Sequence, residues 1–185
     1  MRETIGGVMT NGVDVEALKE TVGQIQNDPA LGKSRFRVTN KWDKGGHNTC
    51  SIGGYFAAGQ ERKHNKEFNL EADEPKELLG TDTCANPVEY LLTALSSCMT
   101  TTIAYHAAAK GIEIESMWSD FQGELDLQGF LNLDPSVPKG YQMIDATFHV
   151  KTAANVDLLE DLYQFSPVYS MVSQSVPINV TFVKE

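Results

Sequence analysis

Apolar and polar residues alternate along the chain with two different periods, and these periods predict where helices and strands lie. Apolar residues at helical spacing predict a first amphipathic helix over residues 13–26. Alternation with a period of two then predicts three strands, over 35–42, 49–57 and 66–71. Beyond the middle of the chain, the same periods predict two strands, two helices and a last strand, over residues 112–127, 142–152, 156–165, 166–174 and 177–183.

The longest apolar stretch, residues 87–110, is the most informative part of the sequence. Asn86 can cap a helix, Pro87 fits the first helical position, and Glu89 stands where the acid of a capping box belongs. The stretch is apolar on nearly every side, which is typical of a buried helix. Cys98 lies in its interior, where a thiol is either an inert small hydrophobe or a nucleophile in a dry pocket.

The predicted elements follow the order α, βββ, α, ββ, αα, β. Strands that come in blocks with helices between them are typical of the α+β class rather than of a doubly wound parallel sheet. A chain of 185 residues fits one domain with a terminal extension. Long polar loops over residues 73–77 and 129–140 separate the blocks, and Gly and Pro mark their turns.

Composition and charge exclude several classes of function. The chain has a net charge of −10 and no basic run, so we expect no nucleic-acid partner. Apolar runs are shorter than the roughly 20 residues of a membrane span, so we expect no membrane insertion. The N-terminal residues lack the apolar core of a secretory signal, and the three cysteines are an odd number without close spacing. We therefore expect a cytoplasmic protein with reduced thiols.

The central sequence Asn-Pro-x-Glu-Tyr-Leu-Leu-x-Ala-Leu-x-x-Cys, which ends at Cys98, resembles a motif of the OsmC/Ohr family, named for osmotic induction and organic hydroperoxide resistance. The later Ser-Pro-Val at 166–168 and Val-Pro-Ile at 176–178 resemble the family's second motif, in which Cys-Pro-Val precedes a strand. The resemblance covers residues 34–185 and leaves 1–33 as an N-terminal helical extension. It implies the OsmC-like fold, an antiparallel or mixed sheet wrapped around a buried central helix, in an intertwined homodimer with sites at the subunit interface.

The resemblance also implies thiol-dependent reduction of organic hydroperoxides, as part of an oxidative stress response. In the family, one cysteine attacks the peroxide, a glutamate and an arginine activate it, and a second cysteine forms a disulfide with it. Cys98 matches the first cysteine, whereas the second falls at Ser166, which cannot form a disulfide. The family's glutamate falls one residue before Glu89. The catalytic candidates are therefore Cys98, Glu89 and Ser166, and we expect a divergent member of the family.

The arginine of the family's site has no aligned counterpart, and its candidates are Arg35, Arg37 and Arg62. Because Ser166 replaces the second cysteine, a peroxidase would need an external thiol to regenerate Cys98. The alternative function is non-catalytic binding of a small apolar or lipid-like ligand in the interface pocket, with Cys98 in its wall. A purely structural stress protein is a third alternative.

The histidines and cysteines of the sequence are the candidate ligands of a metal site. His47 and Cys50 form a His-x-x-Cys pair, and His64 and Cys84 lie further along the chain. A zinc site usually shows a second paired set of ligands at close spacing, and this sequence shows none. We therefore expect no metal and no cofactor.

Overall fold

The computed structural model describes residues 7–185, so the first six residues of the expected N-terminal extension lie outside the described part of the chain. The chain divides into two compact units. Unit 1 consists of the residues up to Leu18 together with Leu92–Glu185, and unit 2 is Lys19–Leu91. Two helices, α1 (Val15–Asn27) and α2 (Pro87–Ala109), cross the boundaries between these units.

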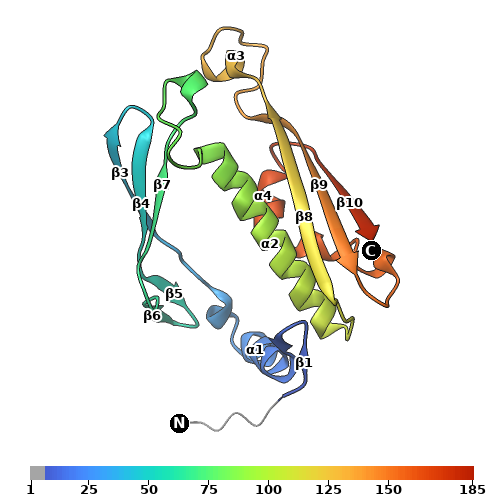
Figure 1. Ribbon diagram of the computed structural model, residues 1–185. Helices are drawn as coiled ribbons and strands as arrows, with labels where there is room; N and C mark the ends of the chain where they lie inside the picture. Colours follow the sequence, from blue (N-terminus) through green and yellow to red (C-terminus); the bar gives the residue numbers. More distant parts are fainter. Residues whose placement is uncertain (1–6) are drawn as a thin grey trace. The chain divides into compact units, whose positions relative to one another are not determined.

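Unit 1 contains a three-stranded mixed sheet in the order β10–β9–β8 (Figure 1). β8 (Ser116–Leu125) pairs antiparallel with β9 (Tyr141–Lys151), and β10 (Ile178–Lys184) pairs parallel with β9. Along β8, half-buried and exposed residues alternate without a break, as the sequence pattern predicts. The central strand β9 supplies the fully buried side chains of this sheet, among them Ile144, Phe148 and Val150.

Helix α2 (Pro87–Ala109) forms where the long apolar stretch predicts it. Leu95, Met99, Ile103 and Ala107 recur every four residues on one side of the helix, and all four are fully buried. This stripe packs in one core with the buried residues of β9. Figure 1 shows the helix alongside β8, with α4 (Pro167–Val172) next to it.

The expectation of a helix buried on every side is not met within one chain. Leu91 and Tyr105 of α2 keep 39% and 47% of their surface exposed. The apolar stretch therefore has one covered stripe and further apolar surface that this single chain leaves accessible. No helix among residues 7–185 is both long and apolar enough to cross a membrane.

The N-terminal part of unit 1 begins with a hairpin that the sequence analysis did not predict. β1 (Met9–Thr10) and β2 (Val13–Asp14) pair across Asn11 and Gly12, which both have positive φ. Asn-Gly is the preferred sequence for this kind of tight turn. The predicted first helix follows as α1 (Val15–Asn27).

The amphipathic helix predicted over residues 156–165 is instead two short 3₁₀ turns, η3 (Val156–Leu158) and η4 (Leu162–Phe165). Its two fully buried residues, Leu159 and Leu162, are three positions apart, which suits the three-residue period of a 3₁₀ turn. A short helix, α3 (Leu127–Phe130), begins at the last residue of the predicted strand 112–127 and continues into the predicted loop 129–140.

Unit 2 contains an antiparallel sheet in the order β3–β4–β7, formed by Val38–Lys44, His47–Ile52 and Phe68–Ala72. The strand predicted over 49–57 is interrupted by Gly53 and Gly54, after which β5 (Tyr55–Ala57) and β6 (Gln60–Arg62) form a separate hairpin. A side chain at Gly54 would collide with the carbonyl group of Arg62. Two 3₁₀ turns, η1 (Pro29–Gly32) and η2 (Lys76–Leu78), complete the unit.

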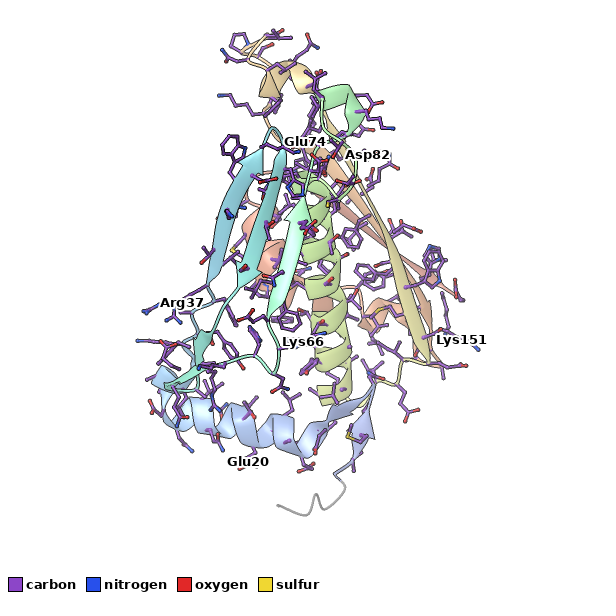
Figure 2. All side chains as sticks on the ribbon, turned by 60° about the vertical axis from the view of Figure 1, so that its left-hand side comes forward. Glu20, Arg37, Lys66, Glu74, Asp82 and Lys151 are labelled. Carbon is purple, nitrogen blue, oxygen red and sulfur yellow. The ribbon has the colours of Figure 1, made fainter. Side chains whose placement is uncertain are left out.

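Few side chains are buried in unit 2. Within residues 19–91, all of which the structure describes, Ala72 and Asp73 are the buried ones. Large apolar side chains on and beside its sheet stay exposed, among them Phe36, Val38, Trp42 and Leu70. At the end of β7 the chain enters a polar loop, where Glu74 accepts a hydrogen bond from the backbone of Asp82 (Figure 2).

Candidate functional site

Cys98 lies in the middle of α2, between the buried residues Leu95 and Met99. It is a free thiol and is half-buried, so it is neither part of the fully closed core nor a surface residue. Thr102, one turn further along, donates a hydrogen bond from its hydroxyl to the Cys98 carbonyl at 2.7 Å. This partial burial leaves the thiol accessible, which a reaction at the sulfur requires.

Glu89 forms the capping box that the sequence predicts. Its carboxylate accepts a hydrogen bond from the backbone N–H of Asn86 at 2.8 Å, and the Asn86 side chain accepts one from the N–H of Glu89 at 2.9 Å. Nine residues separate Glu89 from Cys98, which is about 13 Å along a helix axis. The carboxylate of Glu89 therefore caps the start of α2 and lies far from the Cys98 thiol along the same helix.

Ser166 is fully buried at the N-cap of α4. Its hydroxyl accepts a hydrogen bond from the N–H of Tyr169 at 3.1 Å, and its own N–H donates to the carbonyl of Tyr163 at 2.9 Å. The preceding ring, Phe165, stacks on His106 of α2 with centroids 4.5 Å apart. The segment that carries Ser166 therefore packs against the helix that carries Cys98.

Further contacts join α4 to that same core. Val168, Tyr169 and Val172 pack against the cluster that includes Leu95 and Met99, the neighbours of Cys98 along α2. Figures 1 and 2 both show α4 next to α2. The structure thus brings together the two sequence motifs, one with Cys98 and one with Ser166.

The arginine candidates lie in unit 2. Arg37 forms a bidentate pair with Glu61, with two N–O distances of 2.8 Å. Hydrogen bonds and attraction between the two charges raise the pKa of Arg37, and the bond from Arg37 lowers the pKa of Glu61. The guanidinium of Arg37 is therefore already engaged by a carboxylate of its own unit.

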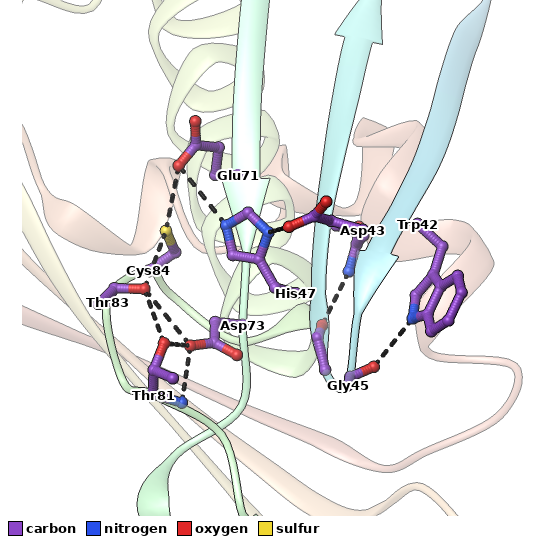
Figure 3. Close-up of polar contacts among 11 residues, drawn as sticks. Trp42, Asp43, Gly45, His47, Glu71, Asp73, Thr81, Thr83 and Cys84 are labelled. Atoms are coloured by element: carbon purple, nitrogen blue, oxygen red, sulfur yellow. Dashed lines mark hydrogen bonds and ion pairs between the residues drawn. The ribbon is translucent and has the colours of Figure 1, made fainter.

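A second group of reactive side chains lies in unit 2, and it differs from the set that the sequence analysis considered. His47, Glu71 and Cys84 each place one potential ligand atom within 4.8 Å of the others (Figure 3). Cys50 is not part of this group because it lies three positions after His47 on β4, and side chains an odd number of positions apart on a strand point to opposite faces. Glu71 could not be chosen from sequence spacing, since the register of β4 with β7 brings it to His47.

A model of the OsmC-like protein family matches residues 80–183, which is more than half of the 185-residue chain. The chain belongs to the OsmC-like protein family. The matched region spans Cys98 and Ser166 together with the core that surrounds them. This match confirms the family resemblance and the α+β fold inferred from the sequence.

Solved structures of OsmC-like proteins share this fold. The OsmC-like protein from Mycoplasma pneumoniae is 16% identical, with a TM-score of 0.61, and the alignment covers 81% of this chain and 96% of that chain. For an organic hydroperoxide resistance protein OsmC from Legionella pneumophila, the identity is 17%, the TM-score 0.56 and the coverage 79% and 96%.

An organic hydroperoxide resistance protein from Elizabethkingia anophelis, crystallised with thiocyanate, is 14% identical with a TM-score of 0.60, and the alignment covers 80% of this chain and 96% of that chain. No curated protein sequence matches the chain closely enough to count as a relative. At these identities the solved structures establish the shared fold.

Proposed function

We propose that this OsmC-like protein reduces organic hydroperoxides through Cys98. The Cys98 thiolate attacks one peroxide oxygen, the O–O bond breaks, and the alkoxide leaves and takes up a proton as the alcohol. The sulfur is oxidised to a sulfenic acid and the peroxide is reduced. The observation that carries the proposal is the position of Cys98. It is a half-buried thiol that by sequence resembles the family's motif cysteine, and it lies on the helix against which the second motif packs.

The catalytic cycle that we propose needs an external thiol, because Ser166 stands where the family's second cysteine belongs. One thiol molecule condenses with the Cys98 sulfenic acid to form a mixed disulfide and water. A second thiol molecule attacks that disulfide, which regenerates Cys98 and releases the oxidised reductant. Each turnover thus converts one hydroperoxide and two thiols into one alcohol, one water and one disulfide.

Kinetic measurements on three serine variants test the proposal. With cumene hydroperoxide and a dithiol reductant, Cys98→Ser should abolish peroxide consumption, whereas Cys50→Ser and Cys84→Ser should retain most of it. These two are matched controls, because each removes one free thiol outside α2. Equal loss of activity in Cys84→Ser would overturn the assignment of a single reacting thiol.

Ser166 itself favours a second candidate function, the binding of a small apolar or lipid-like ligand without catalysis. The residue that would complete the disulfide cycle is replaced by a serine whose hydroxyl already caps α4. In this case Cys98 would line the pocket and remain unmodified. Failure of Cys98 to react with one equivalent of an organic hydroperoxide would favour this function over peroxide reduction.

Ser166→Cys tests the proposed relation between the two motifs. A disulfide between Cys98 and a cysteine at position 166 requires Cα atoms within about 7 Å of each other. We expect peptide mapping of the peroxide-treated variant to show a Cys98–residue 166 cross-link. Over-oxidation of Cys98 to the sulfinic acid without a cross-link would show that the two sites do not meet.

A homodimer in the cytoplasm is also part of this proposal. Apolar side chains on α2 and on the sheet of unit 2 are exposed in one chain, and a second copy could cover them. We expect a dimer with a total interface above about 2,000 Å², as in obligate dimers. Light scattering at micromolar concentration should give twice the chain mass, and a monomer mass would refute the dimer. The three free thiols fit a reducing compartment.

A further inference from the structure

His47, Glu71 and Cys84 meet at one end of the unit 2 sheet. Cys98 belongs to unit 1. His47 begins β4 and Glu71 is the penultimate residue of β7. Thr49 pairs with Glu71 in the antiparallel register, so His47 and Glu71 are diagonal neighbours on one face of the sheet. Figure 3 shows the imidazole of His47 and the carboxylate of Glu71 directed toward each other.

The loop after β7 brings Cys84 to the same place. The buried carboxylate of Asp73 accepts hydrogen bonds from the N–H of Thr81 at 2.9 Å and from the hydroxyl of Thr83 at 3.4 Å. The N–H of Asp73 donates to the carbonyl of Ala85 at 3.4 Å. The hydroxyl of Thr81 donates a further hydrogen bond to this carboxylate at 2.5 Å. Through these hydrogen bonds Asp73 fixes the loop on both sides of Cys84.

Two of the three separations between the donor atoms match those around a single tetrahedral metal ion. Oε2 of Glu71 lies 3.7 Å from Nε2 of His47 and 3.6 Å from Sγ of Cys84. With zinc bonds of about 2.0–2.3 Å and tetrahedral angles, two ligand atoms lie about 3.3–3.7 Å apart. All three atoms lie within 4.8 Å of one another, so closing the set requires a movement of about 1 Å at most.

The other nitrogen of His47 provides an independent observation. Nδ1 is buried and has no hydrogen-bond partner among the residues that the structure describes. Oδ2 of Asp43 lies 3.6 Å from it, slightly beyond hydrogen-bonding distance. A histidine that binds a metal through one nitrogen usually donates its other N–H to a carboxylate, which fixes the ring. Asp43 stands in the position of that outer carboxylate (Figure 3).

We propose that Nε2 of His47, the carboxylate of Glu71 and the thiolate of Cys84 bind one Zn²⁺ ion. Mixed nitrogen, oxygen and sulfur ligands favour zinc, whereas Mg²⁺ and Ca²⁺ take oxygen ligands. Water would fill the fourth position. A cavity of about 480 Å³, lined by Asp43, His47, Asp73 and Thr83 among others, gives solvent a path to the imidazole.

Such an ion would stabilise the part of the chain with the fewest buried side chains. The ligands from β4, β7 and the following loop would link three segments of unit 2. Few buried apolar side chains hold these segments together otherwise. The site goes beyond the proposed peroxide chemistry and uses none of its residues. Loss of the metal and loss of Cys98 activity can therefore be measured separately.

Titration of the reduced, metal-free full chain with zinc and with cobalt tests the site. We expect one metal ion per chain by calorimetry, and a thiolate-to-cobalt charge-transfer band in the near ultraviolet. Cys84→Ser should eliminate that band, and Cys84→Ser and His47→Ala should each weaken zinc affinity by more than about 100-fold. Asp43→Asn, which changes the outer carboxylate, should weaken it by about 10–100-fold.

Matched controls remove the same residue types elsewhere. Cys50→Ser, His64→Ala and Cys98→Ser should bind zinc like the parent chain, and circular dichroism of each metal-free variant checks its fold. If Cys84→Ser is misfolded, the zinc affinities of His47→Ala and His64→Ala are compared instead. The proposal then requires that only His47→Ala binds zinc more weakly than the parent chain. The proposal is overturned if the parent chain binds no zinc at micromolar concentration, if the cobalt band persists in folded Cys84→Ser, or if Cys50→Ser loses the band.

Discussion

Unit 1 buries a contiguous apolar core, whereas unit 2 leaves most of its apolar side chains accessible. In unit 1 the stripe of α2 packs against β9, and Phe148 at the centre has no exposed surface. Its ring contacts Phe121 edge-on and stacks on Phe182. In unit 2 large side chains stay accessible even where they contact one another: Phe36 stacks on Tyr55 and keeps 73% of its surface exposed.

The contrast shows which forces hold each unit. Apolar burial dominates unit 1, because each fully buried large side chain contributes about 1.5–3 kcal/mol. Unit 2 relies on strand pairing and on polar groups, with Asp73 as its buried anchor. The exposed apolar side chains of unit 2 are consistent with the dimer that we propose, in which a second copy covers them. A metal bound by His47, Glu71 and Cys84 would further stabilise the unit.

The largest expected effect comes from the core of unit 1. Phe148→Ala should lower the free energy of unfolding by about 3–5 kcal/mol, because it removes a buried ring and leaves a cavity. Chemical denaturation at fixed protein concentration measures this loss. Phe130→Ala is the matched control, since Phe130 is 61% exposed, and it should change stability by less than about 0.5 kcal/mol. Similar losses in both variants would contradict the packing of unit 1.

A smaller effect is expected at the buried cap of α4. Ser166→Ala removes the acceptor for the N–H of Tyr169 and should cost about 0.5–2 kcal/mol of unfolding free energy. Ser170→Ala is the matched control, because Ser170 lies inside α4 and does not cap it. Thermal unfolding of the two variants measures the difference. If Ser166→Ala is no less stable than Ser170→Ala, the cap does not act as described.

The polar anchor of unit 2 should be visible in the pH dependence of stability. The folded state lowers the pKa of Asp73 below its ordinary value of 3.8, so the unfolded chain binds the proton first as the pH falls. The stabilisation is complete above that ordinary value and is lost as the pH falls toward the folded-state pKa. Asp73→Asn should therefore be less stable at neutral pH and should lose less stability between about pH 4 and pH 2. The free energy of unfolding is measured against pH for the parent chain and for Asp73→Asn. Parallel curves would contradict this role of Asp73.

The smallest effect is expected for the exposed ion pair of unit 2. Arg37 and Glu61 lie at the surface, where water and salt screen the attraction between their charges. Arg37→Gln should leave the melting temperature nearly unchanged, and added salt should remove any difference that is measured. A large, salt-independent loss would contradict the description of this pair as a screened surface contact.

Much of the fold could be predicted because its signals are local. The cap formed by Asn86 and Glu89 and the Ser-Pro start of α4 each require residues close together in the sequence. The Asn11–Gly12 turn carried an equally local signal, but its strands of two residues are too short to show alternation. The helix over 156–165 was wrong because two buried leucines three apart fit a 3₁₀ turn as well as an α-helix.

The candidate sites depend on contacts that the sequence alone does not define. The family motifs nominate Cys98 and Ser166 as candidates. The segments that carry them pack together through side chains distant in sequence, such as His106 and Phe165. The group of His47, Glu71 and Cys84 depends on strand register and on the loop that Asp73 fixes. A one-residue change of register would turn Glu71 to the other face, so spacing alone could not identify it.

The central claim is that Cys98 is the thiol that reacts with hydroperoxide. The most direct measurement treats the reduced chain with one equivalent of cumene hydroperoxide in the presence of dimedone, which traps sulfenic acids, and maps the adduct by mass spectrometry. We predict an adduct at Cys98 that is absent from Cys98→Ser, with Cys50 and Cys84 unmodified. An unmodified Cys98, or equal labelling of all three cysteines, would contradict the account.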